Sequence, residues 1–327
     1  MKSLPFCVAA CVTVALACSC SGAGAQDAKY PARRIDLVVP FPAGGATDVI
    51  ARLAAQLVFE KTGQPVIVQN KAGATGEVGS EYVSRADPDG YTLLVATAST
   101  HAVLPAYHKL PYDTVTSFEE ATLLATFPNM LVVNPDKVSA KTVGELIALL
   151  KSKPGQMNFG SSGSGGSVHF AGELFKYMTE TDMVHVPYRG SAPALNDLLA
   201  GSVDMTFDNM TTVWPFVQQG KLRALGVASL QRTPLAPDIP AIAETVPGYE
   251  ALSWVGVVAP AGTPPAIVDR ISALFGEAVR APQVENRLKE LGGTSASDTP
   301  AEFRKFLTDD RAKWEKLADA ANLHEKE

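Results

Sequence analysis

Residues 35–48 read IDLVVPFPAGGATD, and the apolar run at their start has the length of a buried strand. A glycine-rich loop follows from Pro42 to Asp48. From Val49 onward, apolar residues recur at helical spacing until Gly63 interrupts them. A strand, a tight loop and a helix in this order are typical of a parallel α/β sheet with both faces covered.

The same order recurs along the chain. Val66–Val68 and Tyr91–Thr97 are further apolar runs of strand length. A second glycine loop, Ser161–Ser167, lies between the short strand Met157–Gly160 and the helical run His169–Met178. The sequence therefore predicts an α/β fold with mainly parallel strands. Because no low-complexity linker interrupts the chain, two lobes would have to be joined by strands, and the apolar runs suited to this are Phe127–Val133 and Leu222–Ala228.

The amino terminus has the pattern of a secretory signal peptide. Lys2 precedes an apolar run from Leu4 to Cys18, and the small residues Ala23-Gly24-Ala25 follow. We therefore predict that residues 1–25 form a signal peptide, cut after Ala25, and that the protein is exported to the periplasm. A lipid anchor on Cys18 is the alternative, which is disfavoured because Ala15 stands where lipoprotein signals usually carry Leu.

Composition narrows the class of protein further. All four cysteines lie before residue 26, so the exported chain must be stable without disulfides. The length of 327 residues is enough for two domains with cores of their own. A net charge of −6 and the lack of a basic run argue against a nucleic-acid partner.

The two glycine loops are the main functional signal. Each is predicted to end at a helix start, where free backbone N–H groups and the positive end of the helix dipole favour an anion. Residues 160–167, GSSGSGGS, approach the nucleotide-binding pattern, but Gly166 stands where the phosphate-binding lysine is required. A small anion such as a carboxylate fits these loops better than a triphosphate.

Several side chains near these loops are candidates with two possible roles. Asp48 closes the first loop and either caps the helix or orients ligand-binding donors. Asp208 follows a predicted strand and is either a turn residue or part of the site. Arg189 is the cation nearest a predicted loop, and it either meets a carboxylate or is solvated. Ser99–His101 follow the third strand, where parallel sheets place their ligand crevice, and His101 and His169 are predicted to form hydrogen bonds or serve a structural role.

Catalytic and metal-binding patterns are missing from the sequence. The chain contains no G-x-S-x-G or H-E-x-x-H motif and no cysteine after the leader. His169 and Glu173 share a helix face, but two ligands do not make a metal site. The sequence therefore predicts a binding protein rather than an enzyme, with no metal and no cofactor; a hydrolase using Ser162 or Ser164 with His169 is the disfavoured catalytic alternative.

Seven segments together resemble the receptors of tripartite tricarboxylate transporters, also called the Bug family after Bordetella uptake genes. They run in order over almost the whole exported chain: Pro40–Asp48, Asp87–Leu94, Ser99–Ala102, Ser161–Lys176, His185–Ala194, Val203–Asn209 and Trp254–Pro264. This chain departs from the family pattern at Leu104, where Asn is frequent, and at Phe170, where Leu is usual. If these two positions reach the ligand pocket, they make it more apolar.

The resemblance implies a type II periplasmic binding protein fold, in which two α/β lobes with mainly parallel sheets are joined by two crossover strands. The lobes are expected at residues 26–126 with 226–327, and at 127–225. The implied function is capture of a small organic acid between the lobes by a monomeric receptor that closes on it and delivers it to the membrane subunits of a tripartite tricarboxylate-type transporter. A sensor that presents the acid to a membrane kinase or chemoreceptor is the alternative. The expected ligand-binding residues are Phe41, Ala43, Gly44, Gly45, Ala46, Thr47, Asp48, Ser99, Thr100, His101, Ser162, Gly163, Ser164, Gly165, Gly166, Ser167, His169, Arg189 and Asp208.

Overall fold

The computed structural model describes residues 30–325. The predicted signal peptide and Cys18 lie outside these residues. Within the described range, no helix is both long and apolar enough to cross a membrane.

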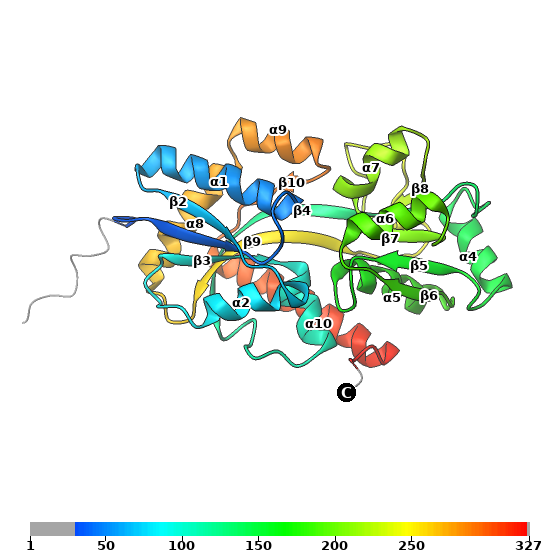
Figure 1. The fold of residues 1–327 in the computed structure, drawn as a ribbon, viewed down its shortest axis with the longest axis horizontal. Helices are drawn as coiled ribbons and strands as arrows, with labels where there is room; N and C mark the ends of the chain where they lie inside the picture. Colours follow the sequence, from blue (N-terminus) through cyan, green and yellow to red (C-terminus); the bar gives the residue numbers. More distant parts are fainter. Residues whose placement is uncertain (1–29, 326–327) are drawn as a thin grey trace, which may run out of the picture.

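Two bodies are joined by long central strands (Figure 1). The sheet of the first lobe has the order β2-β1-β3-β9-β4. Its outer strands β1, β2 and β3 are parallel, whereas β3–β9 and β9–β4 are antiparallel. These strands span Ile35–Val39 (β1), Val66–Asn70 (β2), Thr92–Thr97 (β3), Leu252–Pro260 (β9) and Phe118–Val133 (β4), and the short β10 (Thr294–Ser295) pairs with β4.

Helices cover both faces of this first sheet. Along β1, Leu37 and Val39 pack on one side, with α1, α8 and α9, while Val38 packs on the other, with α2 and α10. Burial on both faces explains why the strand is a continuous apolar run rather than an alternating one. The helices are α1 (Ala46–Thr62), η2 (Ala74–Gly76), α2 (Glu77–Ser84), η3 (Ser99–Val103), α3 (Leu104–Tyr107), α8 (Pro265–Val279), α9 (Pro282–Glu290) and α10 (Pro300–Ala321).

The second lobe repeats this plan on a smaller scale. Its sheet has the order β4-β7-β5-β6, with β8 also paired to β4, and β7, β5 and β6 are parallel to one another. Helices α4 and α5 contribute to the core on one face, and α6 and α7 to the core on the other. The elements are α4 (Val143–Ser152), β5 (Asn158–Ser161), α5 (Ser167–Thr179), β6 (Val184–Pro187), α6 (Ser191–Ala200), β7 (Met205–Asn209), α7 (Met210–Gln218), β8 (Arg223–Val227) and η4 (Ile242–Glu244).

Strand β4 is shared by both lobes. Its first part, through Pro128, pairs with β9, and its last part, from Asn129 to Val133, pairs with β7. The passage between sheets therefore lies inside the predicted crossing Phe127–Val133. The second predicted crossing, Leu222–Ala228, coincides with β8, which pairs with the second-lobe end of β4 and, through a single bridge at Val227, with Ala241.

The chain stays with the second lobe beyond β8. Ala236 and Ala241 are buried in the same core cluster as Leu198, and the chain returns to the first sheet only with β9, at Leu252. This packing favours a second crossing near Ala251 over the predicted boundary at residue 226. An apolar strand inside one lobe and an apolar strand that crosses between lobes have the same sequence pattern, so the run alone did not separate them.

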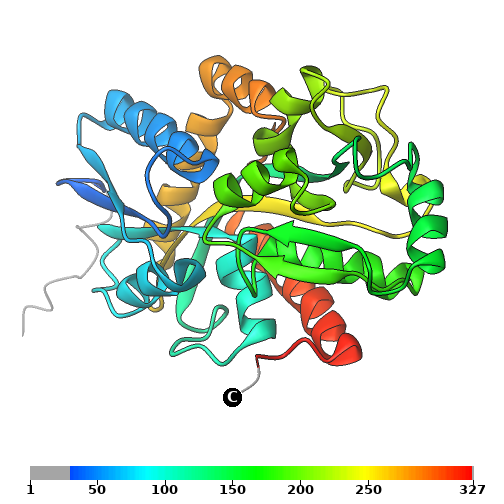
Figure 2. The ribbon, with the colours of Figure 1, turned by 45° about the vertical axis from the view of Figure 1, so that its right-hand side comes forward.

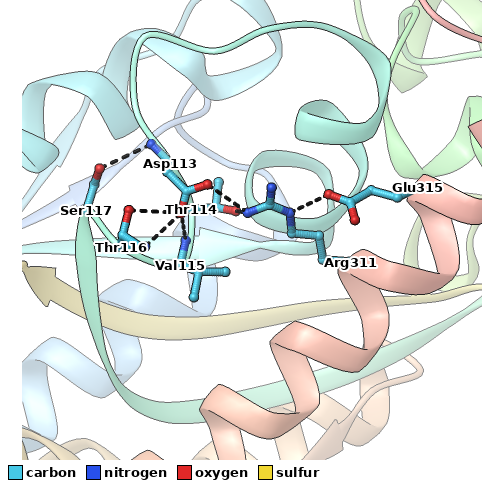
Figure 3. A network of polar contacts seen from close by, with 7 residues as sticks. All are labelled: Asp113, Thr114, Val115, Thr116, Ser117, Arg311 and Glu315. Carbon is cyan, nitrogen blue, oxygen red and sulfur yellow. Dashed lines mark hydrogen bonds and ion pairs between the residues drawn. The ribbon is translucent and has the colours of Figure 1, made fainter.

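The carboxy-terminal helix α10 is tied to the first lobe by polar contacts. Figure 3 shows Asp113, whose Oδ1 accepts the backbone N–H groups of Val115 and Thr116 at 2.9 and 2.8 Å. Arg311 on α10 donates to Asp113 Oδ2 at 3.1 Å and to Glu315 at 2.7 Å. These contacts fix the loop before β4 against α10, which also packs along α5 of the second lobe.

Candidate functional site

The strand directions make the loops of the two lobes face each other. Strands β1, β2 and β3 run in the same direction as β4, toward the second lobe, because two antiparallel pairings separate β3 from β4. Strands β7, β5 and β6 run against β4, toward the first lobe. The carboxyl ends of both sets of strands, where parallel sheets bind ligands, therefore point at the same region between the two lobes. This region is called the junction below. In Figure 2 the blue β1–α1 loop and the green helices of the second lobe lie on facing sides of it.

The start of α5 is buried, and three of its backbone donors have no acceptor within residues 30–325. Its N-cap, Gly166, has no side chain to cap the helix, and Gly165–His169 are all buried. Within residues 30–325, no protein acceptor receives the N–H groups of Gly166, Val168 or His169. Buried backbone donors without partners are costly, so this helix start is suited to an acceptor from outside the chain. The helix dipole makes an anion the favoured one.

The first loop also ends at a helix start, and it is open. Gly45 is the N-cap of α1 and makes no side-chain cap. The N–H groups of Gly45, Ala46 and Thr47 have no acceptor in the described part of the chain. A Cβ placed on Gly44 or Gly45 would meet no atom within 4 Å, and Gly44 has a φ of 92°, which favours glycine. The predicted Phe41 and Ala43 lie in this same loop, half-buried and exposed, respectively.

The buried carboxylate of Asp48 stabilises the first loop through hydrogen bonds. Its carboxylate accepts the Gly44 N–H at 2.9 Å, the Asn70 amide at 2.9 Å and two bonds from Arg52 at 2.9 and 3.0 Å. Burial alone would raise the pKa of Asp48, but the bonds from Arg52, Gly44 and Asn70 lower it to about 2. The charge of Asp48 is therefore satisfied by the protein, which supports a positioning role for this residue.

A third loop, after β2, joins the junction. Thr75 adopts the left-handed conformation with φ of 53°, which is uncommon for a residue other than glycine. A Cβ placed on Gly163 would lie 3.9 Å from Thr75 Oγ1, so the second glycine loop approaches this turn. Backbone strain of this kind concentrates at ligand sites. Thr75 was not predicted as a site residue.

A chain of polar side chains lies at the base of the junction, where β4 and β9 cross. Ser99 donates to Ser167 Oγ at 3.2 Å, and Ser167 N–H donates back to Ser99 Oγ at 3.3 Å. Ser167 Oγ lies 3.4 Å from Ser253 Oγ, and Ser253 donates to Asn129 Oδ1 at 3.2 Å. Asn129 Nδ2 and Oδ1 of its strand partner Asn209 are buried with no partner among the described atoms. Ser253, Asn129 and Asn209 were not predicted as site residues.

Thr100 and His101 point into the first lobe instead of the junction. Thr100 Oγ1 lies 2.9 Å from His101 Nδ1 and also bonds the backbone of Thr97. His101 is fully buried beside Phe118, with ring centroids 4.9 Å apart, and burial lowers its pKa to about 3. The η3 turn directs both side chains inward, so of the predicted Ser99–His101 segment only Ser99 faces the other lobe.

His169 supports the second glycine loop from below. Its Nδ1 accepts the Gly165 N–H at 3.2 Å, and its ring stacks on His185 with centroids 3.8 Å apart. His185 Nε2 in turn lies 2.6 Å from Ser161 Oγ, at the start of the loop. Burial, with smaller contributions from Lys176 and, at His169, from His185, lowers the pKa values to about 3 for His169 and about 4 for His185. Both rings are therefore neutral at pH 7.

These histidines predict a loss of stability in acid. In the unfolded chain, His101, His169 and His185 bind protons near pH 6.5. In the folded protein the same three side chains stay neutral down to pH 3–4. Unfolding therefore takes up protons, and each group lowers the free energy of unfolding by about 1.4 kcal/mol per pH unit below 6.5. Thermal melts between pH 6.5 and 4.5 should show this slope. His169→Asn keeps an acceptor for Gly165 and should flatten the slope, while an unchanged slope would contradict the assignment.

Arg189 and Asp208 differ sharply in exposure. Arg189 is exposed and has no partner within residues 30–325, and its neighbours Tyr188 and Gly190 donate their N–H groups to the carbonyls of Ser161 and Ser162. The backbone at Arg189 is thus held beside the second glycine loop. Asp208 is buried at the end of β7, and burial raises its pKa to about 6.

The two positions that depart from the family pattern pack between the lobes. Phe170 is fully buried and meets Trp314 of α10 and Tyr107 edge-on, with ring centroids 6.0 and 6.3 Å apart. Leu104 and Tyr107 lie against Gly165, where a Cβ would come within 3.2 Å of either side chain. These residues form an apolar contact behind the loop. No group of three or more His, Cys, Asp or Glu within residues 30–325 is placed to hold a metal ion.

Comparison with known proteins gives a consistent family. The family model described as the tripartite tricarboxylate transporter family receptor matches residues 50–323. The protein BugT of Bordetella pertussis is 36% identical over 288 residues, which cover 87% of this chain and 88% of BugT.

Two solved structures share both sequence and fold. The Rpa4515 protein of R. palustris, solved with adipate, is 35% identical, with a TM-score of 0.82, and the match covers 90% of this chain and 98% of that one. MatC from Rhodopseudomonas palustris with bound malate is 31% identical, with a TM-score of 0.79, over 88% of this chain and 99% of that one. The α/β fold with two facing lobes, the glycine loops and these matches together place the chain in the tripartite tricarboxylate transporter receptor family, to which the Bug proteins belong.

Proposed function

We propose that this protein is a periplasmic receptor that captures a small organic acid between its two lobes. The proposal rests on the buried start of α5, where the N–H groups of Gly166, Val168 and His169 have no acceptor in the described chain. A carboxylate oxygen accepts such hydrogen bonds and is stabilised by the helix dipole. The N–H groups of Gly45, Ala46 and Thr47 offer further donors from the opposite lobe.

The exposed cation at Arg189 completes this arrangement. It lies beside the second glycine loop and is available to a charged group at the far end of a ligand. Of the other nearby cations, Arg52 is engaged by Asp48 and Lys71 lies over the Tyr82 ring at 4.1 Å. A ligand with two carboxylates, one at the α5 start and one toward Arg189, uses both features. The adipate and malate bound to the two similar structures are dicarboxylates, which supports this ligand class.

Delivery to a membrane transporter is the second part of the proposal. The family to which the chain belongs is named for tripartite tricarboxylate transporters, and closure of two lobes around a ligand gives a partner a shape to recognise. The receptor is proposed to act as a monomer, with the membrane subunits of such a transporter as its partner.

Thermal unfolding against a panel of acids tests this function. The chain from Gln26 onward would be screened with dicarboxylates, tricarboxylates, amino acids and aromatic acids. A bound acid at one hundred times its dissociation constant should raise the free energy of unfolding by about 2.7 kcal/mol. The uncharged diamide of the best dicarboxylate is the matched control and should give no shift. No shift from any acid, or an equal shift from the diamide, would contradict the proposal.

A further inference from the structure

We propose that Ser253 and Asn129 are positioning residues of the acid site, acting through Ser167. This inference rests on the proposed function and extends it to the crossing strands, where no ligand contact is predicted. The four residues involved, Ser99, Ser167, Ser253 and Asn129, are called the serine chain below. They come from η3, α5, β9 and β4, so the serine chain connects both lobes and both central strands.

The direction of the hydroxyl protons follows from simple accounting. A serine hydroxyl has one proton to donate. Ser253 donates its proton to Asn129 Oδ1, so the bond between Ser253 and Ser167 must be donated by Ser167. Ser167 then accepts from Ser99, as the geometry shows. The amide oxygen of Asn129 therefore orients all three hydroxyl groups in one direction, toward Asn129 on β4.

Asn129 is itself held firmly. It is fully buried, its carbonyl accepts the Ala228 N–H at 2.7 Å, and it lies opposite Asn209 in the β4–β7 register. The fixed end of the serine chain is thus part of the shared strand. Ser167, the first residue of α5, is held toward this end, and the N–H groups of Gly166, Val168 and His169 are left for the carboxylate.

The serine chain also links closure to binding. Ser99 belongs to the first lobe and accepts the N–H of Ser167 from the second, so it supplies the helix cap that Gly166 lacks. Both contacts exist only while the lobes are together. Loss of the Ser253 hydroxyl should therefore loosen the closed form and speed release of the acid, with little effect on its capture.

A double-mutant cycle between Ser167→Ala and Ser253→Ala tests the proposal. Dissociation constants and release rates would be measured for the acid with the largest thermal shift. Each single variant should raise the dissociation constant about fivefold, mainly through faster release, since both lose the neutral hydrogen bond between Ser167 and Ser253. The dissociation constant of the double variant should also be about fivefold above that of wild type, because both changes break the same hydrogen bond between Ser167 and Ser253.

Two controls separate this role from general damage. Ser253→Thr keeps the hydroxyl and should bind within about twofold of wild type. Ser152→Ala removes an exposed hydroxyl that bonds only the Leu149 carbonyl on α4, and it should have no effect. Unchanged binding by Ser253→Ala, or multiplication of the two single effects in the double variant, would overturn the positioning role alone. Wild-type protein that binds no acid would instead overturn the proposed function, and this inference with it.

Discussion

Replacing Ala46 by proline is expected to weaken acid binding about 10- to 100-fold while leaving the fold intact. Ala46 is the first residue of α1, a position that tolerates proline, and the preceding Gly45 has the extended backbone (φ −75°, ψ 167°) that proline requires of its neighbour. The change removes one N–H donor, and a hydrogen bond to a charged group contributes about 1.5–3 kcal/mol. Titration calorimetry of the best acid measures the effect.

The matched control keeps the donor. Ala46→Ser retains the N–H and adds a small side chain at the same half-buried position, so it should bind nearly as wild type. Equal losses in both variants would mean that bulk, rather than the missing donor, weakens binding. If Ala46→Pro kept the wild-type affinity and melting temperature, the start of α1 would not take part in acid binding.

The corresponding change in the second lobe is Ser167→Pro. The preceding Gly166 is also extended, with φ −94° and ψ 166°, so proline can begin α5 without distorting it. Ser167→Ala removes only the hydroxyl, whereas Ser167→Pro removes the N–H as well. The Ser167 N–H is bonded to Ser99 Oγ, so the ratio of the two dissociation constants isolates this contact between the lobes, and a ratio near one would exclude it from a role in acid binding.

Asp48→Ala is expected to lower the free energy of unfolding by about 2 kcal/mol and to weaken acid binding about tenfold. The substitution leaves the Gly44 and Asn70 donors without their acceptor and frees the loop to move. Denaturant unfolding and calorimetry measure the two effects. If Asp48 instead meets an amine of the ligand, amino acids alone would lose affinity, and simple dicarboxylates would bind as before.

The stabilising effect of Asp48 should depend on pH. Its pKa is about 2 in the folded protein and near 3.8 in the unfolded chain, so its contribution is complete above about pH 4 and is lost as pH falls toward 2. The difference in stability between wild type and Asp48→Ala should therefore shrink below pH 4. A constant difference down to pH 2 would contradict the role of the charged form.

Local sequence patterns predicted the elements that carry the site. Gly63, which interrupts the helical spacing in the sequence, ends α1 in the left-handed conformation. Both glycine loops lie between a strand and a helix, as their composition indicated. These features depend on neighbouring residues only, which is why they are readable without a structure.

Features set by strand register were harder to predict. β4 begins at Phe118, nine residues before the predicted crossing. This first part of the strand was not predicted, because Glu119 and Glu120 interrupt its apolar pattern. Glu120 is nevertheless buried, in an ion pair with Arg304 of α10 at 2.7 Å. The partner of a buried charge lies far away in the sequence, so composition alone assigns such a residue to the surface.

Asn129 and Ser253, at the base of the junction, were not predicted from the sequence for a similar reason. Asn129 is a single polar residue in the apolar run Phe127–Val133, and Ser253 directly precedes the apolar strand interior. Neither residue belongs to a motif. They lie close to Ser167 only because β4 and β9 pair side by side where they pass between the lobes. His101 shows the opposite case, in which a residue after a strand end was expected near the ligand but is turned inward by η3.

Backbone amide NMR during acid titration tests the central claim most directly. With ¹⁵N-labelled protein and the acid that gives the largest thermal shift, the amide protons of Gly45–Thr47, Gly166, Val168 and His169 should move downfield the most, because they gain a charged acceptor. The same titration would contradict the account if these amides stayed in place while the acid bound, or if the largest shifts appeared at the hollow of about 730 Å³ between α3 and α10.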